Sequence, residues 1–152
     1  MFTTNYHQQY EINLGQNQEE KIEIIMPKIK TENYTFKGLE YKDSIGSTVS
    51  ISDPNEKTQK FILGSEILFK ITPSRFANPI YYSKENYGHV LEVKNSNIIK
   101  GIDAPPDMTE NLKNARHIVL PLKNAVIEMI TSDPPEELEN YLSKYFVSSD
   151  NK

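Results

Sequence analysis

Short runs in which apolar and polar residues alternate dominate this chain, and strand-breaking residues separate the runs. Alternation places every second side chain on one face of an extended segment, which is typical of a half-buried β-strand. Such runs cover residues 22–26, 34–36, 49–51, 67–71, 90–93, 98–102, 117–122 and 125–130. The last two runs are almost continuously apolar, which predicts a central position covered on both faces. Pro121 should end its strand, because proline donates no backbone hydrogen bond.

Two segments depart from this alternation and predict helices. One is a short helix at residues 108–116. The clearer helix runs from Asp133 to Phe146, with Asp133 as the N-cap and Pro134 at the first helical position. Large apolar residues recur there at helical spacing and form one stripe: Leu138, Tyr141, Leu142, Tyr145 and Phe146.

These segments fit one globular domain over residues 19–147, with 148–152 as a tail. Residues 1–18 are predicted to be a mobile N-terminal segment or a first strand that includes residues 10–14. A chain of 152 residues is about the length of one domain. The predicted architecture is a single β-sandwich or small β-barrel-like domain with the two helices, and an α+β fold is the alternative.

The composition excludes several kinds of chemistry. The chain has no cysteine, so it forms no disulfide, thiolate nucleophile or cysteine-bound metal site. Its net charge is −4 and only two of its 17 basic residues are arginine, which disfavours binding to duplex nucleic acid. It has no glycine-rich phosphate loop, and its three histidines lack metal-ligand spacing. No cofactor and no metal are therefore expected.

The longest apolar runs are four or five residues, and the first residues lack the apolar region of a secretion signal. A helix needs about 20 apolar residues to span a bilayer. The sequence therefore predicts a cytoplasmic protein with no membrane partner.

Two stretches are candidate binding surfaces. The segment 75–88 concentrates aromatic and polar residues of the kind found at interaction hot spots: Arg75, Phe76, Tyr81, Tyr82 and Tyr87. In the alternative interpretation, Phe76, Ile80 and Tyr82 form an extra strand packed on the core. The apolar stripe of the last helix could bind a partner through Leu138, Tyr141, Leu142 and Tyr145, or it could close the domain's own core.

Three hypotheses about function remain open. The leading one is a non-enzymatic protein-binding or assembly module, such as an accessory or structural subunit, an inhibitor or an immunity-type protein. Its partner would be another protein or a second copy of the chain. One alternative is a binder of single-stranded nucleic acid or oligosaccharide that stacks its ligand on tyrosines. The other is a hydrolase or lyase, with Glu85, His89, Asp103 and Asp107 as candidate acid–base residues.

Overall fold

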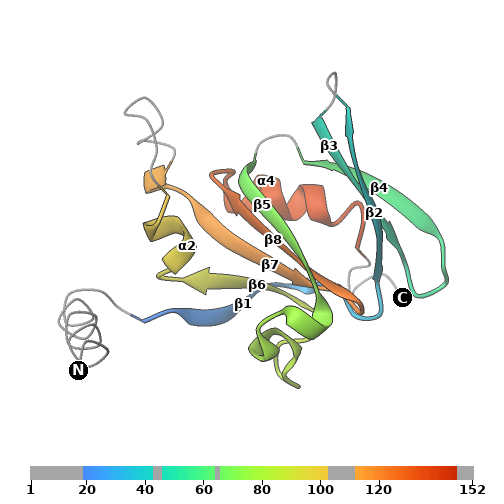
Figure 1. Cartoon of the computed structure of the whole chain (residues 1–152), viewed down its shortest axis with the longest axis horizontal. Coiled ribbons are helices and arrows are strands. Elements are labelled where there is room, and N and C mark those ends of the chain that lie inside the picture. The colour runs from blue at the N-terminus through green and yellow to red at the C-terminus, as the bar shows by residue number, and fades with distance from the viewer. Residues whose placement is uncertain (1–18, 43–45, 64–65, 103–111, 147–152) are drawn as a thin grey trace, which may run out of the picture.

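The computed structural model of this chain describes residues 19–42, 46–63, 66–102 and 112–146 (Figure 1). Its strands are β1 (Lys21–Lys30), β2 (Thr35–Lys42), β3 (Gly46–Ser52), β4 (Thr58–Leu63), β5 (Glu66–Pro73), β6 (His89–Lys94), β7 (Arg116–Pro121) and β8 (Ala125–Thr131). Its 3-10 helices are η1 (Ser74–Phe76) and η2 (Pro79–Tyr82), and its α-helices include α2 (Asn97–Lys100) and α4 (Pro135–Leu142). The prediction of a mainly β fold is confirmed.

The strands form two antiparallel sheets. The larger sheet has the order β1-β6-β7-β8-β5, and the smaller sheet has the order β2-β3-β4. Each sheet keeps two edge strands, so the described residues form a sandwich-like arrangement and no closed barrel. The predicted hairpin at residues 117–130 is confirmed as β7 and β8, and β7 ends at Pro121 as expected.

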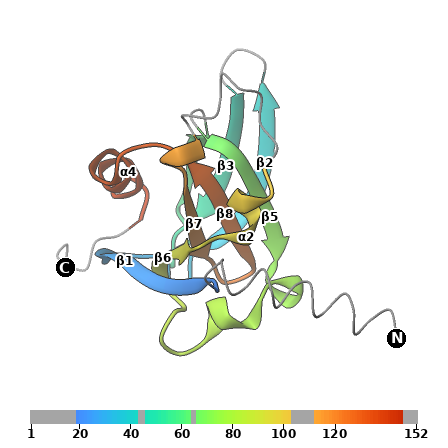
Figure 2. The same ribbon diagram turned by 90° about the vertical axis from the view of Figure 1, so that its left-hand side faces the viewer.

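The main core lies where the two sheets and the C-terminal segment meet. Its buried side chains include Ile118, Leu120 and Ile127 from the large sheet, Val49, Ile51 and Phe61 from the small sheet, and Leu138, Leu142 and Phe146 from the C-terminal segment. A second cluster covers the opposite face of the large sheet and contains Tyr81, Leu91, Val93, Val119 and Val126. All seven residues of β8 are buried, which confirms the predicted central position. Helices α4 and α2 accordingly lie on opposite sides of the β7–β8 pair (Figure 2).

Side chains from other elements occupy the backbone groups at two edges of the small sheet. The Tyr141 hydroxyl accepts from the backbone N–H of Ile62 in β4 and donates to the carbonyl of the same residue. The Asn124 side chain pairs in the same way with the N–H and carbonyl of Phe36 in β2. An exposed strand edge is a template for pairing with another chain. These contacts therefore block part of each edge and fasten the small sheet to the rest of the domain.

The structure corrects the predicted strand at 98–102, because residues Asn97–Lys100 form the helix α2. Ser96 is the N-cap of α2, and its hydroxyl accepts from the N–H of Ile99 at 3.2 Å. A side-chain cap of this kind lets the chain turn into a helix at the point where the sequence suggested a hairpin turn. Asn95 adopts a left-handed φ of 59°, a conformation that asparagine tolerates.

Other predicted elements need smaller corrections. The strand β4 was missed, because polar residues fill its first half and the alternation is short: Phe61 is buried and Ile62 is exposed. Helix α4 begins at Pro135, one residue later than predicted, with Pro134 as its N-cap, and it ends at Leu142 and not at Phe146. Of the predicted helix at 108–116, residues 112–113 are helical, 114–115 are not, and Arg116 already belongs to β7. Residues 108–111 lie outside the described residues, as does the possible first strand at 10–14.

Candidate functional site

Two tyrosines hold the segment 74–88 against the large sheet. Tyr82 donates its hydroxyl proton to the carbonyl of Leu122 at 2.6 Å, and the Tyr87 hydroxyl accepts from the N–H of Asn33 at 3.1 Å. The two rings stack with centroids 5.5 Å apart and planes 26° apart. The predicted alternative of an extra strand is wrong, because the segment forms the two 3-10 helices η1 and η2.

The remaining predicted residues of this segment differ in exposure. Tyr81 is buried and its hydroxyl points into the sheet toward Glu128. Phe76 is 70% exposed, and the Arg75 guanidinium lies 4.9 Å from the centre of its ring. Ile80 is 44% exposed. The open aromatic surface of this segment is therefore the Phe76 ring, with Arg75 over it.

The helix α4 turns its apolar stripe toward its own chain. Leu138 and Leu142 are buried in the main core, and Tyr141 and Tyr145 pack partly against it. The ring of Tyr145 lies 5.4 Å from that of Phe61 in β4. This placement favours the interpretation in which the helix closes the domain, since a buried leucine offers no surface to a partner.

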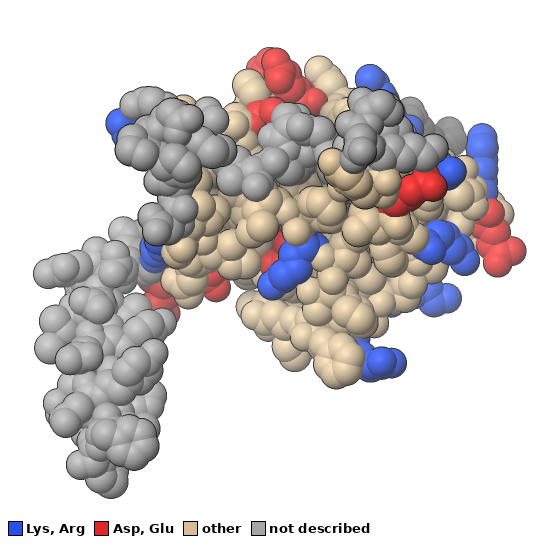
Figure 3. Space-filling view, turned by 45° about the horizontal axis from the view of Figure 1, so that its top comes forward, with Lys and Arg blue, Asp and Glu red and all other residues tan. Residues whose placement is uncertain are grey.

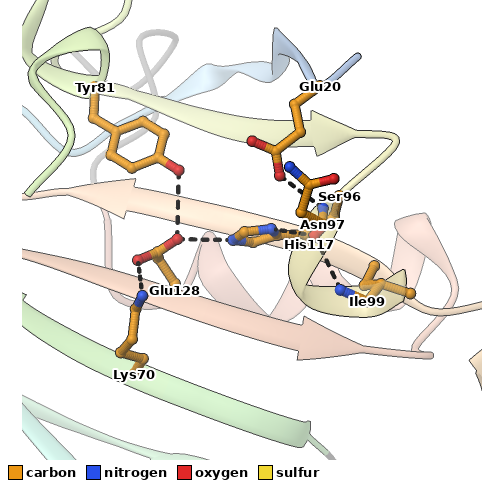
Figure 4. Close-up of polar contacts among 8 residues, drawn as sticks. All are labelled: Glu20, Lys70, Tyr81, Ser96, Asn97, Ile99, His117 and Glu128. Carbon is orange, nitrogen blue, oxygen red and sulfur yellow. Dashed lines mark hydrogen bonds and ion pairs between the residues drawn. The ribbon is translucent and has the colours of Figure 1, made fainter. Parts of the chain in front are cut away.

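A buried polar network crosses the face of the large sheet opposite α4 (Figure 4). His117 in β7 contacts Glu128 in β8 through Nε2 and Oε1 at 2.8 Å, and Ser96 through Nδ1 and Oγ at 2.8 Å. Tyr81 donates to Glu128 Oε1 at 3.4 Å, and Lys70 Nζ lies 3.5 Å from Oε2. His117, Ser96, Tyr81 and Glu128 are each less than 10% exposed. Side chains from three separate parts of the chain, β5, η2 and β7, thus converge on one carboxylate.

The hydrogen-bond partners assign the protons in this network. A carboxylate only accepts, so Nε2 of His117 carries the proton that points to Glu128. When the ring is neutral, Nδ1 is therefore an acceptor, and the Ser96 hydroxyl, which accepts from the N–H of Ile99, donates its proton to Nδ1. A neutral imidazole satisfies every one of these contacts. All the donated protons therefore point along one path from Ser96 through His117 to Glu128.

Burial alone would raise the pKa of the Glu128 carboxyl, since a charged group loses solvation in the interior. The hydrogen bond from His117 and the positive charge of Lys70 outweigh this effect and lower the pKa below its ordinary value. Burial and the neighbouring Glu128 raise the pKa of the Tyr81 hydroxyl, which is a proton donor at neutral pH already at its ordinary pKa. The network consequently holds Glu128 as a carboxylate.

We expect acidification to destabilise the fold through Glu128. Its folded pKa is lowered, so the unfolded state binds the proton more readily, and the stability is lost as the pH falls through the folded pKa. The unfolding free energy, measured by urea denaturation, should decrease as the pH is lowered from about 5 to about 3. Glu128→Gln should flatten this dependence, whereas the exposed control Glu137→Gln should leave it unchanged. Equal slopes in the two variants would contradict the assignment.

Three pockets border His117, and two of them have appreciable volumes. One has a volume of about 230 Å³ and is lined by Tyr81, Glu128, Lys70 and the exposed Phe76. The other has a volume of about 270 Å³ and is lined by Ser96, Lys94, Lys113 and Arg116 among others. His117 lines both. The network thus borders both of these pockets.

The acid–base residues predicted from the sequence do not form this network. Glu85 lies exposed in the turn before β6, and His89 contacts Lys30 at 3.3 Å. Burial and Lys30 lower the pKa of His89. Asp103 and Asp107 lie outside the described residues. The sequence signal that pointed to the real network was Glu128, a charged residue inside the apolar run 125–130.

Charged side chains of both signs are mixed on the surface. On the face drawn in Figure 3, lysines and arginines lie scattered among acidic and uncharged side chains. Within the described ranges, no group of three or more histidines and carboxylates is placed to hold a metal ion. No helix in the part of the chain that the structure describes is long and apolar enough to cross a membrane.

Comparison of the chain with protein-family models, curated proteins and solved structures finds no significant match.

Proposed function

We propose that this domain binds another protein, and that the contact is centred on Phe76. The observation that supports the proposal is that the Phe76 ring is 70% exposed, although it lies in the middle of the sequence. Exposed aromatic residues beside an arginine are typical of interaction hot spots, because both side chains offer a large rigid area with a polar end. Arg75 lies over the Phe76 ring.

The anchoring of the segment supports the same proposal. The contacts of Tyr82 with Leu122 and of Tyr87 with Asn33 fix the segment before any partner arrives. A preformed surface costs less conformational entropy on binding than a loop that must be ordered. Phe76 also lies at a pocket of about 230 Å³ that could receive a side chain of the partner. These features fit a hot-spot ring beside a concave surface.

The alternative of a ligand stacked on tyrosines has less support. Tyr82 and Tyr87 stack on each other, and Tyr81 is buried. A base or sugar would have to displace these contacts before it could stack.

Site-specific photo-crosslinking tests the proposal. A benzophenone side chain introduced at position 76 should give a covalent adduct with a defined protein in extracts of the source cells. Position 41 is the matched control, because Tyr41 is 68% exposed and lies on the small sheet. An adduct formed at 76 and absent at 41 supports the proposal, and an adduct with the mass of two copies identifies the partner as the same chain. Equal labelling at both positions, or none at either, contradicts it.

A further inference from the structure

We propose that Ser96 is the nucleophile of an acyl-transfer site, with His117 as its general base and Glu128 as the group that orients His117. This inference goes beyond protein binding and does not depend on it. It also uses residues other than those that the sequence suggested for a hydrolase.

The three side chains have the spacing that such a site requires. A serine hydroxyl becomes a useful nucleophile when a neighbouring base accepts its proton and a third group fixes the base. Ser96 Oγ lies 2.8 Å from His117 Nδ1, and Nε2 of the same ring lies 2.8 Å from Glu128 Oε1. Either imidazole nitrogen can act as the base, provided that the other one carries the proton. The assigned tautomer meets this condition.

The fold holds these groups rigidly. His117 and Glu128 lie on the paired central strands β7 and β8, which are buried over almost their whole length. Ser96 is fixed at the start of α2 by its bond from the N–H of Ile99. Preorganised groups need no reorganisation at the moment of reaction, which is how most catalytic sites gain their rate.

The pocket beside Ser96 indicates the class of substrate. It has a volume of about 270 Å³, and its lining carries four basic residues, Lys94, Lys100, Lys113 and Arg116, against one acidic residue, Glu92. Glu92 forms ion pairs with Arg116 at 2.6 Å and with Lys94 at 3.4 Å, so the lining keeps an excess of positive charge. One guanidinium nitrogen of Arg116, Nη1, is buried without a hydrogen-bond partner among the described residues. An unsatisfied buried donor of this kind is expected to receive an acceptor. The pocket therefore fits an ester that carries a carboxylate or phosphate group.

The reaction proceeds in two steps. Ser96 Oγ attacks the ester carbonyl carbon while its proton passes to His117 Nδ1, and the protonated ring then gives that proton to the departing alcohol as the ester C–O bond breaks. In the second step, water attacks the acyl–serine carbon and its proton passes to Nδ1. The acid leaves when the C–O bond to Ser96 breaks and the serine oxygen takes that proton back. Throughout, Glu128 holds Nε2–H and stabilises the charged ring.

A purely structural role would give Ser96 and His117 the same contacts, so the test must measure reactivity. A fluorophosphonate probe reports it directly: Oγ bonds to phosphorus, fluoride leaves, and the serine gains a mass that peptide sequencing locates. We expect labelling of Ser96 in the folded protein and none in Ser96→Ala. The exposed Ser143 provides the matched control, and Ser143→Ala should label like the wild type.

Glu128→Gln separates reactivity from folding. Its amide oxygen can still accept from Nε2–H, so the variant should keep its fold by circular dichroism, while the labelling rate should fall roughly 100-fold. If Glu128→Gln labels at the wild-type rate, or if the probe labels another serine or none, the proposal is overturned.

A pair of 4-nitrophenyl esters tests the substrate class. An ester whose acyl chain ends in a carboxylate should be hydrolysed faster than the neutral acetate ester, and added salt should reduce this preference because it screens the pocket's positive charges. Lys94→Ala should reduce the preference as well, without abolishing hydrolysis of the acetate ester. Equal rates of hydrolysis for the two esters would contradict the assigned substrate class.

Discussion

Replacing Phe146 with alanine should lower the free energy of unfolding by about 3–5 kcal/mol. The Phe146 side chain is 1% exposed, and its ring lies 4.9 Å from that of Tyr34 and 6.2 Å from that of Phe61. Removal of the ring leaves a cavity at the point where the C-terminal segment meets both sheets. In a domain of this size each kcal/mol corresponds to about 2–4 °C, so the melting temperature should fall by roughly 6–20 °C.

The neighbouring Lys144 provides the control for this substitution. Lys144 is exposed, so Lys144→Ala should change the unfolding free energy by less than about 0.5 kcal/mol. Urea denaturation followed by circular dichroism measures both variants. A loss below about 1 kcal/mol in Phe146→Ala would mean that the C-terminal segment does not pack on its own core. The stripe that begins at Leu138 would then again be available to a partner.

The sequence predicted the elements whose local pattern of apolar residues matches their burial in the fold. The stripe from Leu138 to Phe146 predicted a helix with one apolar face; the helix ends at Leu142, and Leu138, Leu142 and the following Phe146 are buried in the core. The runs 117–122 and 125–130 predicted paired central strands, because a sheet covered on both faces needs apolar residues at every position. In these cases burial by distant elements agreed with the local pattern.

The pattern of apolar residues predicted the wrong secondary structure where a single side chain decided the conformation. Ile98 and Ile99 suggested a strand, but the cap from Ser96 to the N–H of Ile99 turned the chain into α2. Phe76, Ile80 and Tyr82 suggested a strand at 76–82, but the chain forms a 3-10 helix there, which begins at Pro79 with Asn78 as its cap. Such choices depend on one or two hydrogen bonds, which periodicity does not record.

The polar network was hidden for a different reason. His117 and Glu128 lie on adjacent strands, with Val119 directly opposite Glu128, so the predicted hairpin already brought them close. The approach of Ser96, however, required α2 in place of a strand. Tyr81 reaches Glu128 from 47 positions away in the chain, through a segment whose path the sequence did not reveal.

Replacing His117 with leucine should lower the free energy of unfolding by about 3–5 kcal/mol. The substitution removes the donor that Glu128 needs at 2.8 Å and the acceptor that the Ser96 hydroxyl uses. The remaining contacts of Glu128, from Tyr81 at 3.4 Å and Lys70 at 3.5 Å, are longer and weaker. A carboxylate would stay buried without its main partner, which is the costly way to break a buried pair.

A double-mutant cycle distinguishes the interaction energy between His117 and Glu128 from a simple loss of packing. Glu128→Leu alone leaves His117 without an acceptor, so it should also be strongly destabilising. The double variant removes both polar groups and should lose less than the sum of the two, with a coupling energy of about 1–3 kcal/mol. Chemical denaturation of the four proteins at neutral pH gives this energy. A coupling below about 0.5 kcal/mol would mean that Glu128 and His117 do not act as a unit. Glu128 would then have no means of orienting the base that the Ser96 site requires.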